Sequence, residues 1–111
     1  MDVHRISVAQ ALIDALRART YLEIGVSRGQ AFQRISADVK FAVDPVFRLT
    51  ERTRELADAK GRVVQYFETT SDAFFENEQA LLAQHPVDVA LIDGLHTYEQ
   101  EIGRASCRER V

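Results

Sequence analysis

One short stretch of the chain, Glu23 to Gly29, combines an acidic side chain, two glycines and a serine hydroxyl. It follows an apolar segment that predicts a buried strand. Gly25 has no Cβ, so the backbone can turn sharply there and lie against a ligand. We expect Gly29 to open the next helix, whose free N–H groups would face the turn. A strand, a glycine turn and a helix start are together typical of a site for a nucleotide-like cofactor.

Two carboxylates accompany this turn. Asp44 ends the next predicted strand, where it can accept hydrogen bonds from both ribose hydroxyls of an adenosine cofactor. The alternative is an ordinary loop acid before Pro45. Glu23 stands among apolar residues, and a buried carboxylate needs partners. It can hold the N–H groups of the turn or reach a cationic ligand group through water, unless it lies on an exposed strand face.

Polar side chains also follow the third and fourth predicted strands. Ser71 and Asp72 can lie near an adenine ring, cap the following helix, or do both. Asp93 is expected beside the first strand, where it can touch the substrate, the reactive group or a divalent metal. His96 can act as a base near neutral pH, or it caps the next helix at the surface. A metal at Asp93 stays open, because further oxygen ligands would be needed.

The glycine turn also spells G-x-S-x-G, the nucleophile elbow of hydrolases, with Ser27 as the nucleophile. That chemistry needs an acid and then a histidine later in the chain. Asp93 and His96 follow in this order, but they are too close together to be independent members of a triad. A Ser27 hydrolase is therefore a remote alternative.

Strands and helices alternate along the chain. We predict strands at 20–24, 40–44, 63–67 and 87–93 and helices at 7–18, 28–37 and 49–60, with another beginning at Ser71 or Asp72 and ending before Pro86. Gly61 stands where a helix C-cap belongs. This alternation predicts an α/β fold with right-handed crossovers and a parallel sheet.

Three of these helices have apolar positions that we expect to face the sheet. The first helix should bury Val8, Ala11, Leu12, Ala15 and Leu16. The second should bury Ala31, Phe32 and Ile35, and the last Phe74, Phe75, Leu81 and Leu82.

Composition excludes several classes of function. The 111 residues are 46% hydrophobic and carry a net charge of −3, with acidic and basic residues interspersed. This gives no basic face for nucleic acid and no attraction to an anionic membrane. The first residues, Met1 to Arg5, lack the apolar core expected of a signal peptide, and the sequence has no apolar run of membrane-spanning length. We expect a cytoplasmic protein that acts on a small molecule; its oligomeric state is left open.

Residues 101–111 show no apolar periodicity and are similar to the conceptual translation of a sequencing adapter. We therefore predict that the natural sequence departs from this one near Gln100, and that 101–111 is a non-native tail. The alternative is a frayed, arginine-rich helix. An apolar fourth strand without a neighbour would then make the chain prone to self-association.

Three motifs in order resemble a known family. The stretch Glu23-Ile-Gly25-Val-Ser-Arg-Gly29 is similar to motif I of class I S-adenosylmethionine-dependent methyltransferases, and Phe41-Ala-Val-Asp44 is similar to their strand-two acid. The segment Leu91-Ile-Asp93-Gly-Leu-His96-Thr-Tyr98 resembles a bacterial branch called methyltransferase domain 24. The resemblance covers residues 18–100. It implies a doubly wound, Rossmann-like parallel sheet of seven strands with helices on both faces, of which residues 1–100 supply strands one to four, in the order 3-2-1-4.

The resemblance also implies roles for single residues on the cofactor side. Gly25 and Gly29 would line the methionine part of S-adenosyl-L-methionine, with Glu23 near its amino group. Asp44 would hold the ribose. Ser27 departs from the family pattern, in which many relatives have glycine, and would line the same turn.

On the reaction side, Ser71 or Asp72 would lie near the adenine and Asp93 would face the methyl-transfer site. The implied reaction is methyl transfer to a small-molecule or cell-envelope, sugar-type acceptor, with His96 as base where the acceptor is a hydroxyl. The alternatives are half of an NAD(P)-dependent oxidoreductase, although the turn lacks G-x-G-x-x-G spacing, and an inactive fragment.

Overall fold

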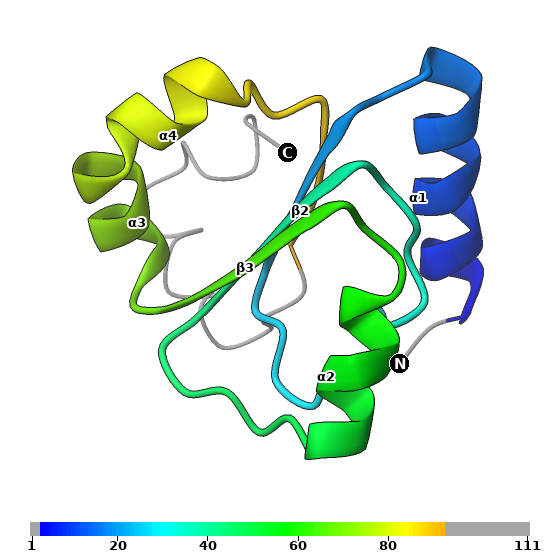
Figure 1. Ribbon diagram of the computed structural model, residues 1–111, viewed down its shortest axis with the longest axis horizontal. Helices are drawn as coiled ribbons and strands as arrows, with labels where there is room; N and C mark the ends of the chain where they lie inside the picture. Colours follow the sequence, from blue (N-terminus) through cyan, green and yellow to red (C-terminus); the bar gives the residue numbers. More distant parts are fainter. Residues whose placement is uncertain (1–2, 93–111) are drawn as a thin grey trace.

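The computed structural model describes residues 3–92, which form a four-stranded, fully parallel sheet with helices on both of its faces (Figure 1). The strand order is β3-β2-β1-β4, which confirms the expected order 3-2-1-4. The strands are β1 (Thr20–Ile24), β2 (Val39–Asp44), β3 (Val63–Glu68) and β4 (Val89–Ile92). Each pairs in register with its neighbour, for example Leu22 with Phe41 and with Ala90.

The two central strands are buried along nearly their whole length. Every residue of β1 is buried, and β2 is buried up to Asp44 at its end. Their apolar runs need no polar alternation because helices cover both sheet faces. β3 and β4 are more exposed, as expected of the outer strands of the described sheet.

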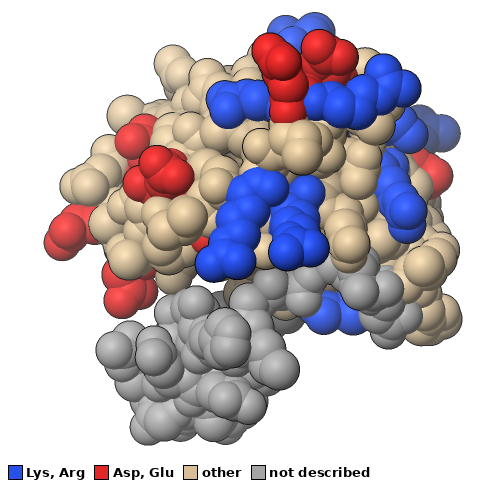
Figure 2. Space-filling view, turned by 90° about the horizontal axis from the view of Figure 1, so that it is seen from below, with Lys and Arg blue, Asp and Glu red and all other residues tan. Residues whose placement is uncertain are grey.

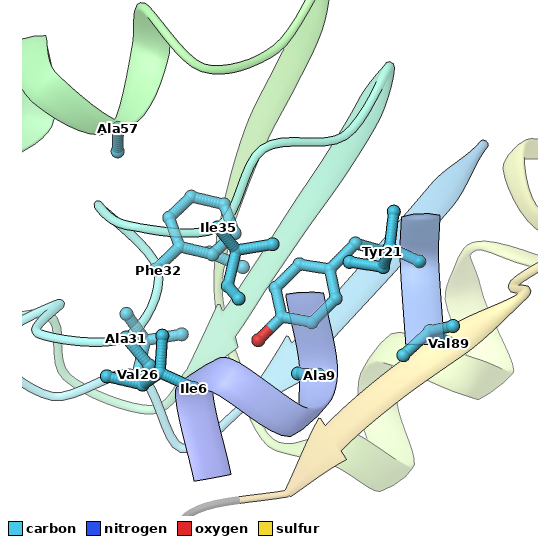
Figure 3. Close-up of a cluster of buried hydrophobic side chains, with 11 residues drawn as sticks. Ile6, Ala9, Tyr21, Val26, Ala31, Phe32, Ile35, Ala57 and Val89 are labelled. Atoms are coloured by element: carbon cyan, nitrogen blue, oxygen red, sulfur yellow. The ribbon is translucent and has the colours of Figure 1, made fainter. Parts of the chain in front are cut away.

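One face of the sheet, called the α1 face below, is covered by α1 (Val3–Leu16), residues 26–35 and α2 (Glu51–Asp58). This face has a hydrophobic core, in which Figure 3 shows Tyr21 lying between α1 and the aromatic ring of Phe32. Its buried members are Ile6, Ala9, Ile13, Tyr21, Val26, Ala31, Phe32, Ile35, Ala42, Ala57 and Val89.

The opposite face, called the α3 face below, is covered by α3 (Ser71–Asn77) and α4 (Gln79–Gln84). Its buried members are Leu22, Ile24, Val39, Phe41, Val43 and Phe74. Because successive strand residues point to opposite faces, Lys40 belongs to the α1 face and Phe41 to the α3 face.

The first helix covers the sheet as expected but with a different stripe. It begins at Val3, and its buried residues are Ile6, Ala9 and Ile13. The stripe that we predicted is wrong: Val8 and Leu12 are nearly half exposed, Leu16 is 64% exposed, and Ala11 and Ala15 are also exposed. The helix carries two apolar stripes, so periodicity alone does not choose between them.

A polar contact fixes the rotation of this helix. The Gln10 amide donates to the Ser36 carbonyl (3.0 Å) and accepts from the Ser36 N–H (2.7 Å). This two-way contact turns Gln10 toward residue 36 and thereby brings the neighbouring Ala9 and Ile13 onto the sheet.

The predicted helix at 28–37 is wrong. Residues 26–35 form a series of single turns, of which Gly29 N–H to Val26 O (2.9 Å) and Gln33 N–H to Gly29 O (3.0 Å) are examples. Ser27 and Gly29 both have positive φ (53° and 77°), which right-handed helix excludes, so Gly29 does not open a helix. The predicted apolar residues Ala31, Phe32 and Ile35 are nevertheless buried.

The later helices differ from expectation at their ends. α2 is capped by Thr50 and ends in a C-cap at Ala59, so Gly61 lies beyond it. α3 is capped by Thr70, whose hydroxyl accepts from the Ala73 N–H (3.1 Å). Ser71 and Asp72 are the first helical residues and not the cap.

The expected final helix is divided at Glu78 into α3 and α4. Of its predicted apolar residues, Phe74 is buried, Leu81 and Leu82 are half-buried, and Phe75 is 44% exposed. Phe75 directly follows Phe74 in α3, so the two rings cannot both point at the sheet.

Candidate functional site at the carboxyl edge of the sheet

The carboxyl ends of the strands form one edge, because all four strands run in the same direction, downward in Figure 1. The chain moves outward from β1 to β2 and β3 and then returns to place β4 on the other side of β1. The order therefore reverses between β1 and β4. In open α/β sheets, ligands bind outside the carboxyl ends of the strands at such a reversal. The glycine turn directly follows β1 and so lies at this position.

The backbone of the glycine turn has an uncommon shape. Gly25, Ser27 and Gly29 all have positive φ, at 83°, 53° and 77°. The Gly25 N–H donates to Val43 O (2.9 Å), which keeps the start of the turn attached to β2. A Cβ on Gly29 would lie 2.5 Å from Leu49 Cδ2, so a larger residue there would force the Leu49 side chain to move. Gly25 and Gly29 are thus required by the backbone itself, whatever ligand the turn meets.

Asp44 joins the glycine turn to the end of β2. Its Oδ2 accepts from the Ser27 N–H (2.7 Å) and its Oδ1 from the Val46 N–H (3.0 Å). The Arg48 N–H in turn donates to Ser27 O (3.0 Å), so two bonds hold the turn against the segment after β2. A carboxylate has about four lone-pair positions, so each oxygen of this half-buried group keeps one for a ligand hydroxyl.

Glu23 lies inside the α1 face and not at an exposed strand surface, since its side chain is fully buried. The Tyr21 hydroxyl donates to Glu23 Oε1 (2.7 Å). The negative charge of Glu23 also acts on the buried ammonium of Lys40, where it opposes part of the pKa decrease that burial causes. Glu23 is therefore a buried carboxylate, as the apolar sequence around it indicates. Ile24 alone separates it from the turn.

The segment after β3 is tied to the same edge. The Thr69 N–H donates to Asp44 O (3.0 Å), and Glu68 Oε2 accepts from the Phe47 N–H (3.2 Å). Ser71 is half-buried and Asp72 is exposed at the start of α3. The structure thus brings Gly25, Ser27, Gly29 and Asp44 together and connects the Ser71–Asp72 segment to them through Thr69. The other two predicted site residues, Asp93 and His96, lie outside the described residues.

Sequence reasoning missed Lys40, which lies on the α1 face near the start of β2, the strand that Asp44 ends. Its side chain is fully buried, and its Nζ donates to Phe32 O (2.7 Å) and Ala57 O (3.0 Å). Burial lowers the pKa of the Lys40 ammonium to about 8. The available signal was a lysine in the second position of an otherwise apolar strand, since lysine is almost never fully buried without partners.

The carboxyl edge carries charges of both signs. Figure 2 shows the molecule from below, so that the carboxyl ends of the strands point toward the viewer. Basic side chains lie near the middle of this face and acidic ones toward its margins. Within residues 3–92 no group of three or more His, Cys, Asp or Glu side chains is placed to hold a metal ion. Nor does this part of the chain contain a helix long and apolar enough to cross a bilayer.

A shallow hollow of about 520 Å³ lies at the opposite edge, where the strands begin. Its lining comes from the end of α1, from residues 36–38 and from Lys60. Beside it, Asp38 pairs with Arg62 (2.9 Å) and Arg19 (3.3 Å), and the Arg62 hydrogen bond lowers the pKa of the Asp38 carboxyl to about 2. The glycine turn and Asp44 are at the other end of the strands, so we assign the candidate site to the carboxyl edge by topology and not by the size of this hollow.

Comparison of the chain with protein-family models, curated proteins and solved structures finds no match in any of the three.

Proposed function

We propose that this chain supplies the cofactor-binding half of a class I S-adenosylmethionine-dependent methyltransferase, the strands one to four of a seven-stranded sheet. The observation that carries the proposal is the bond from the Ser27 N–H to Asp44 Oδ2 (2.7 Å). It joins the glycine turn, which follows β1 at the reversal of the strand order, to the carboxylate at the end of the neighbouring β2, and an adenosine cofactor needs both groups side by side.

Different residues of this edge would bind different parts of the cofactor. Gly25, Ser27 and Gly29 would line its methionine part. Gly25 is half-buried and Ser27 is exposed, whereas Gly29 is buried beside Leu49 and would act through the shape of the turn. Glu23 would attract the ammonium group through water, since its own side chain has no exposed surface. The free lone pairs of Asp44 would accept the ribose hydroxyls.

The adenine and the reacting groups would meet residues further along the chain. Ser71 or Asp72 would lie near the adenine. Asp93 would face the transfer site, and His96 would take the proton from a hydroxyl acceptor. S-adenosylmethionine supplies a methyl group already activated by its sulfonium, so the protein mainly has to orient the acceptor against it. The proposed acceptor is a small molecule or a cell-envelope, sugar-type hydroxyl.

A hydrolase with Ser27 as nucleophile receives one favourable observation. Ser27 is exposed and has a φ of 53°, as a nucleophile elbow requires strain at that residue. An elbow is a strand-to-helix turn, however, and residues 26–35 form no helix. This reading therefore predicts covalent labelling of Ser27 by a fluorophosphonate, which the methyltransferase proposal does not.

Calorimetric titration of the purified 111-residue chain with S-adenosylmethionine and with NAD tests the proposal. We expect saturable binding of S-adenosylmethionine, weakened roughly tenfold or more by Asp44→Asn because a charge-assisted bond to the ribose is lost. Glu55→Gln makes the equivalent change at an exposed carboxylate of α2, away from the carboxyl edge of β2, and should leave binding unchanged. Binding of NAD alone, or no saturable binding by a chain that melts cooperatively, would defeat the proposal.

A further inference from the structure

Lys40 occupies a place in which a charge is costly. It lies in the central strand β2, with no exposed surface, among apolar side chains of the α1 face. An isolated ammonium in such surroundings would lose far more hydration than packing returns, so it persists only with well-placed acceptors. The contacts of the Lys40 ammonium therefore indicate the role of this residue.

The ammonium of Lys40 connects three parts of the molecule. Its Nζ donates to Phe32 O (2.7 Å) in the segment after the glycine turn and to Ala57 O (3.0 Å) in the last turn of α2. It also lies 4.4 Å from the centre of the Phe32 ring, a favourable cation–π distance. A cation at the C-terminal end of α2 further suits the direction of the helix dipole.

The segment that Lys40 reaches has little backbone structure of its own. Residues 26–35 contain single turns in place of the expected helix. Bonds from other elements hold the start and end of the segment: Asp44 takes the Ser27 N–H, and Gln10 binds both backbone groups of Ser36. Between these two points, Lys40 supplies the polar contact at Phe32 O.

We propose that Lys40 is a positioning residue for the glycine turn: its buried ammonium holds the segment 26–35 onto β2 and α2 and thereby sets the place of Gly25–Gly29 relative to Asp44. The effect of Lys40 on cofactor binding rests on the proposed function. The ordering of residues 26–35 by Lys40 does not, since it concerns the free protein.

Hydrogen exchange of the free chain tests the ordering of residues 26–35. In Lys40→Met, which keeps the length of the apolar stem and removes the donors, we expect the amides of residues 26–35 to lose about tenfold or more of their protection. Those of β1 and β3 should change less than about threefold. Lys60→Met is the matched control, because Lys60 is exposed at the end of α2 and should change neither. Unchanged protection at 26–35, or an equal loss throughout the sheet, would overturn the proposal.

A chemical rescue separates the ammonium from the packing of the stem. Lys40→Cys, aminoethylated in the unfolded protein and refolded, restores an ammonium at lysine length and should restore protection at 26–35. Cys107 is modified in parallel in the wild-type sample. If Lys40→Met does not melt cooperatively, Lys40→Gln, which keeps a neutral donor, takes its place. Failure of both to fold would show that Lys40 supports the whole sheet, and would also overturn the proposal.

Titration of the same variants with S-adenosylmethionine tests the consequence for binding. We expect roughly tenfold weaker binding in Lys40→Met, recovery in the aminoethylated variant and no change in Lys60→Met. If the wild-type chain itself does not bind S-adenosylmethionine, the proposed function falls while the exchange result still decides the role of Lys40. Normal affinity together with lost protection would show that Lys40 orders the segment without positioning the site.

Discussion

The two faces of the sheet bury different kinds of side chain. The α3 face is apolar and rich in aromatic rings: Phe41 meets Phe67 at 6.0 Å between ring centres, and Phe67 meets Phe74 at 5.0 Å. The α1 face also buries rings, but beneath them lie Glu23 and Lys40, a carboxylate and an ammonium with no exposed surface. The α3 face is held by apolar and aromatic packing, whereas the α1 face adds directed polar bonds to an apolar core of its own.

This difference coincides with the difference in secondary structure. α3 and α4 cover the apolar face as helices, while part of the α1 face is covered by the turns of residues 26–35. The bonds within a segment of turns do not fix its place on the sheet, so this place comes from its buried apolar residues and from bonds to other elements, among them those of Lys40 and Asp44. The candidate site adjoins the face whose geometry is held in this way. Adjacent residues on β2, Lys40 and Phe41, therefore allow the two faces to be compared directly.

The largest expected effect belongs to the apolar face. Phe41→Ala should lower the free energy of unfolding by about 3–5 kcal/mol, because it removes a fully buried ring and leaves a cavity between Phe67 and His85. Urea denaturation measures this loss. Exchange protection should fall throughout the sheet and not only at residues 26–35. A loss confined to one segment would contradict the view that this face acts by general packing.

The next effect is a pH dependence of the free energy of unfolding, which originates from Lys40 on the α1 face. Burial lowers the pKa of Lys40 to about 8 in the folded protein, against 10.5 for the exposed group. Between these values the unfolded chain binds the proton that the folded chain has released, so the free energy of unfolding rises with pH. We expect a gain of about 2 kcal/mol between about pH 7.5 and 9.5, measured by urea denaturation.

Lys40→Met should abolish this gain, because it removes the group that titrates. Measurements stop near pH 9.5 because burial raises the pKa of Tyr66, which makes stability fall at still higher pH. A gain that survives in Lys40→Met would assign the titration to another group.

A smaller effect tests the buried carboxylate. Tyr21→Phe removes the hydroxyl that donates to Glu23 Oε1 and should cost about 1–2 kcal/mol, because a buried hydrogen bond is lost. Tyr66→Phe is the matched control: its hydroxyl donates to Asp58 (2.6 Å) in a less buried place, and its loss should cost less than half as much. Equal losses in urea denaturation would remove the distinction between the core of the α1 face and its margin.

The smallest effect tests whether burial controls the apolar face. Phe75 is 44% exposed although it packs against Phe74 at 5.4 Å between ring centres. Phe75→Ala should lower the melting temperature slightly, corresponding to about 1 kcal/mol, because much of the ring stays in water. A loss as large as that of Phe41→Ala would show that aromatic contact, and not burial, sets the stability of this face.

Most of the fold could be predicted from the sequence because strands leave a strong local signal. β1 and β2 are mainly apolar and are followed by glycine or proline, and these features predict a parallel sheet covered on both faces. The position of Asp44 beside the glycine turn followed from the same reasoning, because the carboxyl ends of parallel strands share one edge. The bond that joins Asp44 to Ser27 was not foreseen, since it depends on the path of the turn.

The errors have a common cause. The apolar spacing of Ala31, Phe32 and Ile35 suits a helix, but these residues reach the core from a series of turns. On α1, two apolar stripes were equally suitable locally, and the contact between Gln10 and Ser36 chose one of them. In both cases a contact between segments distant in sequence outweighed local periodicity.

The sequence by itself determined the strands, their parallel arrangement in the order 3-2-1-4 and the gathering of glycines and Asp44 at one edge. These features follow from local apolar runs and from the handedness of crossovers, which act on neighbouring segments. The tertiary structure alone decided which stripe of α1 is buried, that residues 26–35 form turns, and that the ammonium of Lys40 binds Phe32 O and Ala57 O. Each of these outcomes depends on partners far along the chain, which become available when the sheet and its covering layers assemble.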